Sequence, residues 1–511
     1  MDKVPTLSPW AWWAVLVPAA LKLLVHVLTS GAYGYFRDEL YFLDCARHLQ
    51  WGYVDDAPGI VILAKAGLLM GGTLPAVRIL AALAGAATVV LASMFARELG
   101  GRSFAQALAG LCVLAAPICL GVDSLLCCGA FEPLFWVGCA FLAIRILRTE
   151  RTGLWLWFGV VAGLGLQLKY TMLLVLACFL AAMLLTSARR EMRRPVFWAG
   201  AGLAFLIFLP ALVWQINNHF PLIEDMQNIS RTGKNVVLGP MEFVKQQIEF
   251  LDPLLLPIWC AGLVFLLRRE GTRFLGLFYL LLLAAMILLH GKNYYLAAVY
   301  PMLFAAGAVA VEEAFDRWSW SRGRAWPRVA LISLVAATFV IFVPGLLPLL
   351  PPQKLVAYQA AIGIRPRNQE TNHEGPLEQR FGDQFGWREM TEEVAAIYRS
   401  LPESERAKTA IFTGNYGEAG AIDQFGPALG LPPAICAHQA DSFWGLPPVE
   451  PDTVICLGCD RKGLESQFAS VAMAGEHHHP WGMPYENRPI FVCRGLRTPF
   501  RELWPRLTHW N

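Results

Sequence analysis

The chain has 511 residues, of which 56% are hydrophobic, 12% are aromatic and only 16% are charged, with a mean hydropathy of +0.45. This composition is too apolar for a soluble domain and is typical of a protein with several membrane spans. The formal net charge of +3 is small, and no basic run alternates with aromatic residues, which argues against nucleic acid as a partner. We therefore treat the chain as a multi-pass membrane protein.

Eleven apolar runs predict the membrane helices. The first, near residues 10–28, is long enough to span and lacks the features of a removable signal peptide, so we expect it to be retained. Runs 154–168 and 171–186 are short for a span of about 20 residues, so we expect two tilted helices or one re-entrant hairpin. The other runs lie near residues 75–96, 104–121, 130–147, 196–216, 253–267, 274–290, 294–312 and 328–349.

Arginine clusters between alternate runs predict the orientation, because positively charged loops stay in the cytoplasm. The N-terminus is then cytoplasmic, and the opposite, outer side holds residues 30–73, the segment 217–252 and everything after about residue 350. The clustered residues are Arg97, Arg102, Arg145, Arg148, Arg151, Arg189, Arg190, Arg193, Arg194, Arg268, Arg269, Arg273, Arg317, Arg322, Arg324 and Arg328.

The character of the chain changes near residue 350. After it come mixed charge, short apolar runs at 409–412 and 453–457, a helical pattern at 389–401 and many glycines and prolines. We therefore predict a mostly α protein. A transmembrane helical bundle of about 11 spans over residues 1–350 is followed by a small α/β domain on the outer side over residues 351–511, long enough to bury its own core.

Four of the twelve cysteines fall in this outer domain. An oxidising compartment would permit disulfides among them, but the spacing does not set their pairing. The Cys456-x-x-Cys459 spacing could be half of a zinc site, yet no second pair follows, and the run His477–His479 is more typical of a surface turn than of a ligand set. The four cysteines are Cys436, Cys456, Cys459 and Cys493.

The first outer loop, residues 30–73, brings together carboxylates in an otherwise apolar region. Apolar residues at 36, 40, 43, 46 and 49 follow helical spacing and predict a surface helix whose apolar face lies in the lipid boundary. Asp38 and Glu39 lie at its start, where a helix favours negative charge, so a solvated helix start is one interpretation. The other is a carboxylate that accepts a proton from an attacking hydroxyl.

Five motifs in order carry a family resemblance. The run Gly34–Lys65, GYFRDELYFLDCARHLQWGYVDDAPGIVILAK, resembles the first outer loop of bacterial membrane glycosyltransferases related to dolichyl-phosphate-mannose protein mannosyltransferases and to the aminoarabinose transferase of lipid A. These are glycosyltransferases of the GT-C type, similar to family 39. The further matching segments are Ala130–Trp136, Gly163–Thr171, His290–Pro301 and Gly414–Asp423.

The resemblance implies a GT-C fold in the bacterial inner membrane that transfers a sugar from a polyprenyl-phosphate donor on the periplasmic face. The acceptor would be a lipid, a glycan such as lipopolysaccharide, or a protein. By position, Asp38 matches the catalytic acidic residue and Glu39 its companion. Asp56 and Glu132 are weaker matches, which we expect to support the site or bind the acceptor.

The departing phosphate needs positive charge, and the outer turns supply it. Lys169 and Lys292 lie at two such turns beside tyrosines, and Arg37 is a third candidate. The alternative interpretation is that these lysines simply extend to the interface and that the tyrosines form an interfacial belt. The tyrosines that could contact sugar or phosphate are Tyr170, Tyr294 and Tyr295.

This scheme needs no metal or other cofactor, and a direct displacement with one base predicts inversion at the sugar carbon. A divalent metal held by Asp38 with Asp56 or Glu132 is disfavoured, because the carboxylate spacing has no coordination signature. In the outer domain, we expect acceptor selection near three residues. They are Tyr416, Glu418 and Asp423.

Two other functions stay open. A secondary transporter would also have many spans, but it should place ionisable groups near the bilayer midplane and repeat a pattern of broken helices in its two halves. A lipid-binding or scaffold protein without catalysis would not need the pair Asp38 and Glu39. Substitution of Asp38 separates these hypotheses, because only an enzyme should lose its function.

Overall fold

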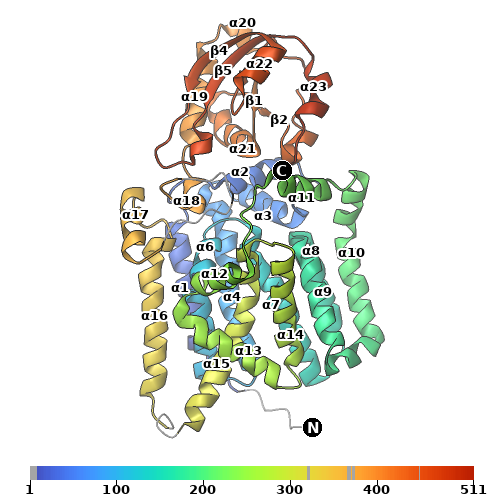
Figure 1. Cartoon of the computed structure of the whole chain (residues 1–511), viewed down its shortest axis with the longest axis vertical. Coiled ribbons are helices and arrows are strands. Elements are labelled where there is room, and N and C mark those ends of the chain that lie inside the picture. The colour runs from blue at the N-terminus through green and yellow to red at the C-terminus, as the bar shows by residue number, and fades with distance from the viewer. Residues whose placement is uncertain (1–7, 319–322, 365–369, 371–374, 448, 511) are drawn as a thin grey trace. The chain divides into compact units, whose positions relative to one another are not determined.

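The computed structural model describes residues 8–318, 323–364, 370, 375–447 and 449–510 (Figure 1). The chain forms two compact units, and each is described by itself. Unit 1 is drawn from Met1–Gly31, Arg78–Leu212 and Val237–Leu349, and unit 2 from Ala32–Val77, Val213–Val236 and Leu350–Asn511.

Unit 1 is built of apolar helices, and each of the eleven predicted apolar runs falls on helical structure. Helices α4 and α10 each extend a few residues into unit 2. The helices are α1 (Trp12–Thr29), α4 (Leu74–Glu98), α5 (Ser103–Ala115), α6 (Pro117–Val122), α7 (Cys128–Thr149), α8 (Leu154–Leu168), α9 (Thr171–Leu184), α10 (Pro195–Asn217), α12 (Pro240–Phe250), α13 (Leu256–Arg268), α14 (Arg273–Leu288), α15 (Tyr300–Arg317) and α16 (Trp326–Leu346), with 3-10 turns η1 (Ser187–Arg193), η2 (Pro253–Leu255) and η3 (Asn293–Val299).

The described part of the chain has 6 helices long and apolar enough to cross a membrane, or up to 8 if each of two bent pairs is one span. The pair α9 with η1 bends by 107°, and the pair α12 with α13 bends by 93°. Shorter apolar helices are α5, α8, α14 and, in unit 2, α3 (Pro58–Leu69). The prediction of a multi-pass membrane protein is confirmed, and the count of 11 spans stays a prediction.

Glycines set the distance between neighbouring helices in unit 1. A Cβ atom on Gly262 of α13 would collide with the carbonyl oxygen of Leu303, and one on Gly307 of α15 with that of Ile258. Small residues let helix backbones approach in lipid, where no hydrophobic effect drives helices together. The α13–α15 contact therefore depends on the absence of side chains at two positions.

Unit 2 combines loop helices with a small α/β structure, which confirms the predicted fold class. Its helices are α2 (Arg37–Arg47), α3, α11 (Pro221–Thr232), α17 (Pro352–Ala361), α18 (Gln379–Gly382), α19 (Trp387–Ser400), α20 (Glu403–Arg406), α21 (Tyr416–Phe425), α22 (Arg461–Gln467) and α23 (Phe500–Leu507), with 3-10 turns η4 (Gly426–Leu429), η5 (Gln439–Phe443) and η6 (Pro484–Glu486).

A five-stranded sheet forms the centre of unit 2, in the order β2-β1-β3-β5-β4. Strand β1 is parallel to β2 and β3, and β5 is antiparallel to β3 and β4. Ile411 of β1 lies opposite Ala434 and Ile455 and is fully buried, as expected for a central strand covered on both faces. The strands are β1 (Thr409–Thr413), β2 (Ala434–Cys436), β3 (Thr453–Cys456), β4 (Phe468–Glu476) and β5 (Pro489–Leu496).

Helix α21 leaves the sheet directly after β1 and packs on α2. Asn415 caps its start, since the side-chain oxygen accepts hydrogen bonds from the amides of Gly417 and Glu418 at 2.9 and 3.0 Å. A Cβ atom on Gly420 would lie 2.7 Å from the Leu40 backbone, so only glycine permits this close approach. The motif found between Gly414 and Asp423 therefore places the end of β1 beside the first outer loop.

Candidate active site

Helix α2 confirms the helix predicted in the first outer loop, but its surroundings differ from the prediction. Leu40, Leu43 and Ala46, on its apolar face, are fully buried within unit 2. The expectation that this face lies in the lipid boundary is wrong, because it packs against protein, including α21 and α3. Helix α2 is therefore a core element of unit 2.

The two carboxylates at the start of α2 have different surroundings. The Glu39 side chain is fully buried, and its Oε2 accepts a hydrogen bond at 2.9 Å from the Phe36 amide, which closes the first turn of the helix. The Asp38 side chain is 39% exposed. Of the predicted acidic pair, Asp38 is the member that a substrate can reach.

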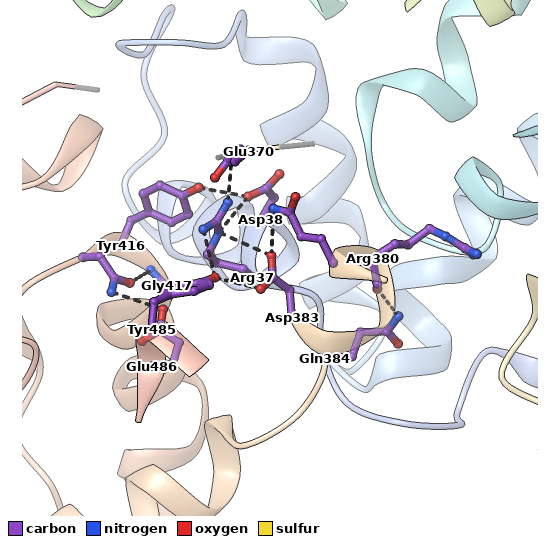
Figure 2. A network of polar contacts seen from close by, with 12 residues as sticks. Arg37, Asp38, Glu370, Arg380, Asp383, Gln384, Tyr416, Gly417, Tyr485 and Glu486 are labelled. Carbon is purple, nitrogen blue, oxygen red and sulfur yellow. Dashed lines mark hydrogen bonds and ion pairs between the residues drawn. The ribbon is translucent and has the colours of Figure 1, made fainter. Parts of the chain in front are cut away.

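The guanidinium of Arg37 contacts Asp38 and two further carboxylates (Figure 2). Arg37 Nε lies 3.7 Å from Asp38 Oδ1 and 3.9 Å from Asp383 Oδ2, and Arg37 Nη2 lies 3.5 Å from Glu370 Oε1. Arg37 Nη1 donates to the Tyr485 hydroxyl at 3.0 Å. Figure 2 shows these groups arranged around Arg37. Three segments distant in sequence thus meet at one cation, and these residues form the Asp38 cluster.

Two aromatic rings also contact the Arg37 guanidinium. Its Cζ lies 5.5 Å from the centroid of the Tyr416 ring and 5.9 Å from that of Tyr485. Burial lowers the pKa of Arg37, but Tyr416, Tyr485 and the nearby carboxylates raise it, and the net pKa is well above the ordinary arginine value. Arg37 therefore remains a cation in this buried position.

Tyr416 holds Asp38 through one oxygen. Its hydroxyl donates to Asp38 Oδ1 at 3.1 Å, and burial keeps the pKa of Tyr416 well above the ordinary value, so the hydroxyl keeps its proton. Across the described residues, Asp38 Oδ2 accepts no hydrogen bond. One oxygen of Asp38 is therefore fixed by Tyr416 and Arg37, while the other can accept a proton, or a hydrogen bond from a hydroxyl group.

The other tail residues singled out in the sequence lie deeper in unit 2. Burial raises the pKa of Glu418 to about 7, although its Oε2 accepts a hydrogen bond from the Gly414 amide at 2.8 Å. Burial, followed by the neighbouring Asp44, raises the pKa of Asp423 to about 8. Of the three tail residues, Tyr416 is the one that donates a hydrogen bond to Asp38.

In the first outer loop, Asp55 and Asp56 lie beyond α2. Asp55 Oδ1 accepts a hydrogen bond from the Tyr41 hydroxyl at 2.8 Å, and burial together with Asp56 and Asp225 raises the pKa of Asp55 well above its ordinary value. The Asp56 carbonyl oxygen accepts a hydrogen bond from the Tyr53 amide at 3.2 Å. Asp55 and Asp56 thus help to fold the loop after α2.

A second polar cluster, in unit 1, contains three of the predicted phosphate-binding residues, namely Lys169, Tyr294 and Tyr295. Lys169, between α8 and α9, has its Nζ 4.0 Å from Glu132 Oε2 and 3.9 Å from the centroid of the Tyr295 ring. Thr171 Oγ1 donates to Glu132 Oε1 at 2.7 Å, and the Tyr294 ring lies 4.9 Å from that of Tyr295. These residues from four elements form the Lys169 cluster.

The last two predicted residues of unit 1 are Lys292 and Tyr170. Lys292 precedes η3, its carbonyl oxygen accepts a hydrogen bond from the Tyr295 amide at 3.1 Å, and within the described ranges its ammonium forms no ion pair. The Tyr170 ring packs edge-on against Phe208 at 6.2 Å. Lys292 is thus a half-buried residue two positions before Tyr294 in the sequence, while Tyr170 has an aromatic packing partner.

Metal-binding groups do not assemble in the described residues, where no three His, Cys, Asp or Glu side chains could hold an ion. His477 Nδ1 lies 2.9 Å from Glu393 Oε2, and His479 Nδ1 accepts hydrogen bonds from the amides of Trp481 and Gly482. None of the twelve cysteines, all of which lie in the described residues, forms a disulfide, Cys456 and Cys459 included. The histidine run is therefore part of a turn with internal hydrogen bonds.

Sequence reasoning missed three members of the Asp38 cluster, namely Glu370, Asp383 and Tyr485. No motif surrounds them, and Tyr485 is 448 residues from the arginine that it contacts. Periodicity and spacing report only neighbours along the chain, so contacts of this kind leave no local signal. The short motif at Gly414–Asp423 was the one signal that the tail approaches the first outer loop.

The chain is similar in sequence and in fold to known membrane proteins. Residues 55–214 match the model of the family described as dolichyl-phosphate-mannose-protein mannosyltransferase. No curated protein matches the chain by sequence. The solved structure of ArnT from Cupriavidus metallidurans bound to undecaprenyl phosphate has a TM-score of 0.59 at 14% identity, over 94% of this chain and 98% of that chain.

A second solved structure is more distant. The oligosaccharyltransferase of Archaeoglobus fulgidus, tethered with an acceptor peptide, has a TM-score of 0.50 at 12% identity, over 81% of this chain and 63% of that chain. Together with the family match, these structures confirm the expected resemblance. The chain has the fold of a GT-C type membrane glycosyltransferase.

Proposed function

We propose that this protein is a glycosyltransferase that moves a sugar from a polyprenyl-phosphate donor to an acceptor hydroxyl on the periplasmic face of a bacterial inner membrane. The observation that carries the proposal is the state of Asp38, which is held through Oδ1 by Tyr416 and Arg37 while its side chain is 39% exposed. A general base must have a fixed position and an oxygen that is open to the proton it takes. Asp38 meets both conditions.

In the proposed reaction, Asp38 Oδ2 takes the proton of the acceptor hydroxyl as its oxygen attacks the anomeric carbon of the sugar. The bond from that carbon to the phosphate oxygen breaks, and polyprenyl phosphate leaves with the bonding electron pair. A single displacement inverts the configuration at the anomeric carbon. Glu39 supports the reaction indirectly, because its hydrogen bond to the Phe36 amide fixes the turn that carries Asp38.

The Lys169 cluster supports a phosphate-binding role. At 4.0 Å from Glu132, the Lys169 ammonium is too far for a close hydrogen bond, and its side chain is 20% exposed, so it can turn to a new anion. Lys292 adds a second positive charge, and Tyr294 and Tyr295 supply hydroxyl donors. Cations aimed at a departing phosphate stabilise the charge that develops in the transition state.

The donor class is supported by the relative whose structure was solved with undecaprenyl phosphate. The acceptor is proposed more broadly as a lipid, a glycan of the lipopolysaccharide type or a protein, with Asp56 and Glu132 in supporting roles. The arginine distribution supports the periplasmic orientation. No step of the proposed reaction is assigned to a metal.

The test uses the purified protein in lipid with a panel of radiolabelled polyprenyl-phosphate sugars and a membrane extract as acceptor. We expect wild type to transfer label from one donor and Asp38→Asn to lose about 10²- to 10⁴-fold of that rate. Asp452→Asn is the matched control, since this carboxylate is 67% exposed and pairs with Lys408. Equal transfer by wild type and Asp38→Asn would remove Asp38 from the role of base, and a retained anomeric configuration would exclude a single displacement.

A further inference from the structure

We propose that Asp383 is a positioning residue for this reaction, which acts on Asp38 through Arg37. The inference rests on the proposed function, since it assumes that Asp38 takes the proton. It assigns a part in sugar transfer to the tail of unit 2, from which Asp383 and Tyr485 come, in addition to any part in acceptor selection. The contacts of Asp383 distinguish it from the other two carboxylates around Arg37.

Asp383 is the most enclosed carboxylate in the cluster. Its side chain is 0% exposed, compared with 11% for Glu370 and 39% for Asp38. A buried carboxylate has no water to replace its cation, so it holds the cation strongly. Asp38 can exchange its contact with Arg37 for solvent, whereas Asp383 cannot. Asp383 is therefore the anchor of the guanidinium.

Both oxygens of Asp383 are used in this contact. Asp383 Oδ1 accepts a hydrogen bond at 2.7 Å from the Tyr485 hydroxyl, which in turn accepts one from Arg37 Nη1 at 3.0 Å. Asp383 Oδ2 faces Arg37 Nε at 3.9 Å and accepts a hydrogen bond from Gln379 Nε2 at 3.3 Å. Asp383 thus holds two sides of the guanidinium, one directly and one through Tyr485.

The backbone around Asp383 is fixed as well. The Asp383 carbonyl oxygen accepts a hydrogen bond from Trp387 Nε1 at 2.7 Å, across the turn that leads into α19. The next carbonyl, that of Gln384, packs directly on Gly34, where a Cβ atom would collide with it. The anchor is therefore attached both to the tail and to the residues that lead into α2.

A fixed guanidinium matters because Arg37 and Asp38 are adjacent on the first turn of α2. An arginine side chain has many rotamers, and without its anchor it would offer Asp38 no fixed positive charge, so that the Tyr416 hydroxyl alone would hold Asp38. Misplacement of a reacting group by about 1 Å can reduce a rate about 100-fold. Loss of Asp383 should therefore slow the transfer step. Donor binding should change little, because the substitution leaves the Lys169 cluster, which we propose holds the donor phosphate, intact.

The first experiment is a double-mutant cycle of transfer with the full chain in lipid: wild type, Asp383→Asn, Arg37→Gln and the double variant. We expect Asp383→Asn to lower kcat about 10- to 100-fold, with the KM for the donor within about threefold of wild type. In the Arg37→Gln background, Asp383→Asn should have no further effect, because its route to Asp38 is gone. Tyr485→Phe should reduce kcat in the same direction by less.

Two outcomes of the cycle would overturn the inference. Wild-type kcat in Asp383→Asn would show that the anchor has no effect on transfer. Effects of Asp383→Asn and Arg37→Gln that multiply would show that Asp383 acts independently of Arg37, as a merely structural residue would. Asp452→Asn is again the matched control, because it removes one carboxylate charge from the same unit at an exposed position.

A second measurement does not depend on activity. Amide hydrogen exchange in the segment 36–43 should become faster in Asp383→Asn and stay unchanged in Asp452→Asn, because the start of α2 loses its anchor. Unchanged exchange in Asp383→Asn would overturn the inference even if wild type transfers sugar. If exchange is faster in Asp383→Asn but wild type transfers no sugar from any donor, the proposed function is contradicted and the anchoring role of Asp383 is kept.

Discussion

Units 1 and 2 each bury a cation beside a carboxylate, and the two pairs differ in how completely they are enclosed. In unit 1, Lys22 Nζ on α1 lies 2.8 Å from Asp123 Oδ2 and donates to the Cys119 carbonyl oxygen at 3.0 Å, with side-chain exposures of 0% and 5%. In unit 2, the closest Arg37 nitrogen lies 3.7 Å from Asp38 Oδ1, and Asp38 is 39% exposed.

The difference indicates that the first pair stabilises the fold and that the second can take part in a reaction. A fully enclosed pair with short contacts has no capacity for a further ligand, and its value lies in joining α1 to the end of α6. A cluster with longer contacts and one exposed carboxylate can exchange a partner when a substrate arrives. The Lys169 cluster is of the second kind, because its ion pair is 4.0 Å long and its lysine is 20% exposed.

The largest expected effect on stability comes from breaking the enclosed ion pair of Lys22 and Asp123. Lys22→Met leaves Asp123 buried without its cation, and removal of one partner of a buried pair costs about 3–5 kcal/mol. The loss should appear as a lower midpoint in thermal unfolding of the detergent-solubilised protein. Lys22→Met with Asp123→Asn should recover much of it, because both charges are then gone. A single variant as stable as wild type would contradict the comparison.

The second prediction concerns the open cluster of unit 1. Lys169→Gln should raise the KM for the polyprenyl-phosphate donor about 10- to 100-fold, since a hydrogen bond to a charged group contributes about 1.5–3 kcal/mol. Its thermal stability should change little, because the ion pair with Glu132 is long. Lys245→Gln is the control in the same unit, at a side chain that is 60% exposed. An unchanged donor KM would remove Lys169 from phosphate binding.

The third prediction tests the close packing of α21 on α2, the helix that carries Asp38. Gly420→Ala adds a Cβ atom 2.7 Å from the Leu40 backbone, and such overpacking costs about 1–3 kcal/mol. Gly463→Ala, in α22, adds the same atom with its nearest neighbour 3.8 Å away and should instead stabilise its helix by up to about 1 kcal/mol. Equal unfolding midpoints for the two variants would show that α21 tolerates a wider separation from α2.

The fourth prediction is a pH dependence of stability that arises in the interior of unit 2. The folded pKa values of Glu418 and Asp423, about 7 and about 8, lie above the ordinary 4.5 and 3.8, so the folded protein binds these protons more tightly than the unfolded chain. The resulting stability is fully present below about pH 4 and is lost as pH rises to about 8. Thermal unfolding midpoints measured from pH 5 to 9 should fall with rising pH.

Glu418→Gln and Asp423→Asn test the source of this fall. Each substitution replaces a titrating carboxyl with an amide of similar shape and should flatten the dependence of the unfolding midpoint on pH. A slope equal to that of wild type in both variants would assign the effect to other groups. The change should be independent of donor, since neither residue is among the proposed donor contacts.

Much of the fold could be predicted from local pattern, because apolar periodicity is a property of neighbours in sequence. The eleven apolar runs, the strand runs at 409–412 and 453–457 and the helix at the start of the first outer loop were predicted in this way. The burial of α2 could not be predicted, since its apolar face packs against α21, almost 400 residues away. An amphipathic segment looks the same whether lipid or protein covers it.

The candidate site divides in the same manner. Asp38, Lys169 and Glu132 could be predicted because each belongs to a motif at a turn with its own chemical signature. Asp383 and Tyr485 could not, because their role arises only from the distance to Arg37 in the folded chain. The residues that bind substrate in our proposal carry sequence motifs, whereas the residues that hold them in place do not.

The central claim is that the Asp38 cluster serves catalysis, whereas the enclosed pair of Lys22 and Asp123 serves folding. The most direct test measures transfer rate and thermal unfolding together for Asp38→Asn and Lys22→Met. The account predicts that Asp38→Asn unfolds at the wild-type temperature and transfers about 10²- to 10⁴-fold more slowly, while Lys22→Met unfolds at a lower temperature and, at temperatures where it remains folded, transfers at nearly the wild-type rate. Wild-type transfer by Asp38→Asn, or a lost rate in folded Lys22→Met, would contradict it.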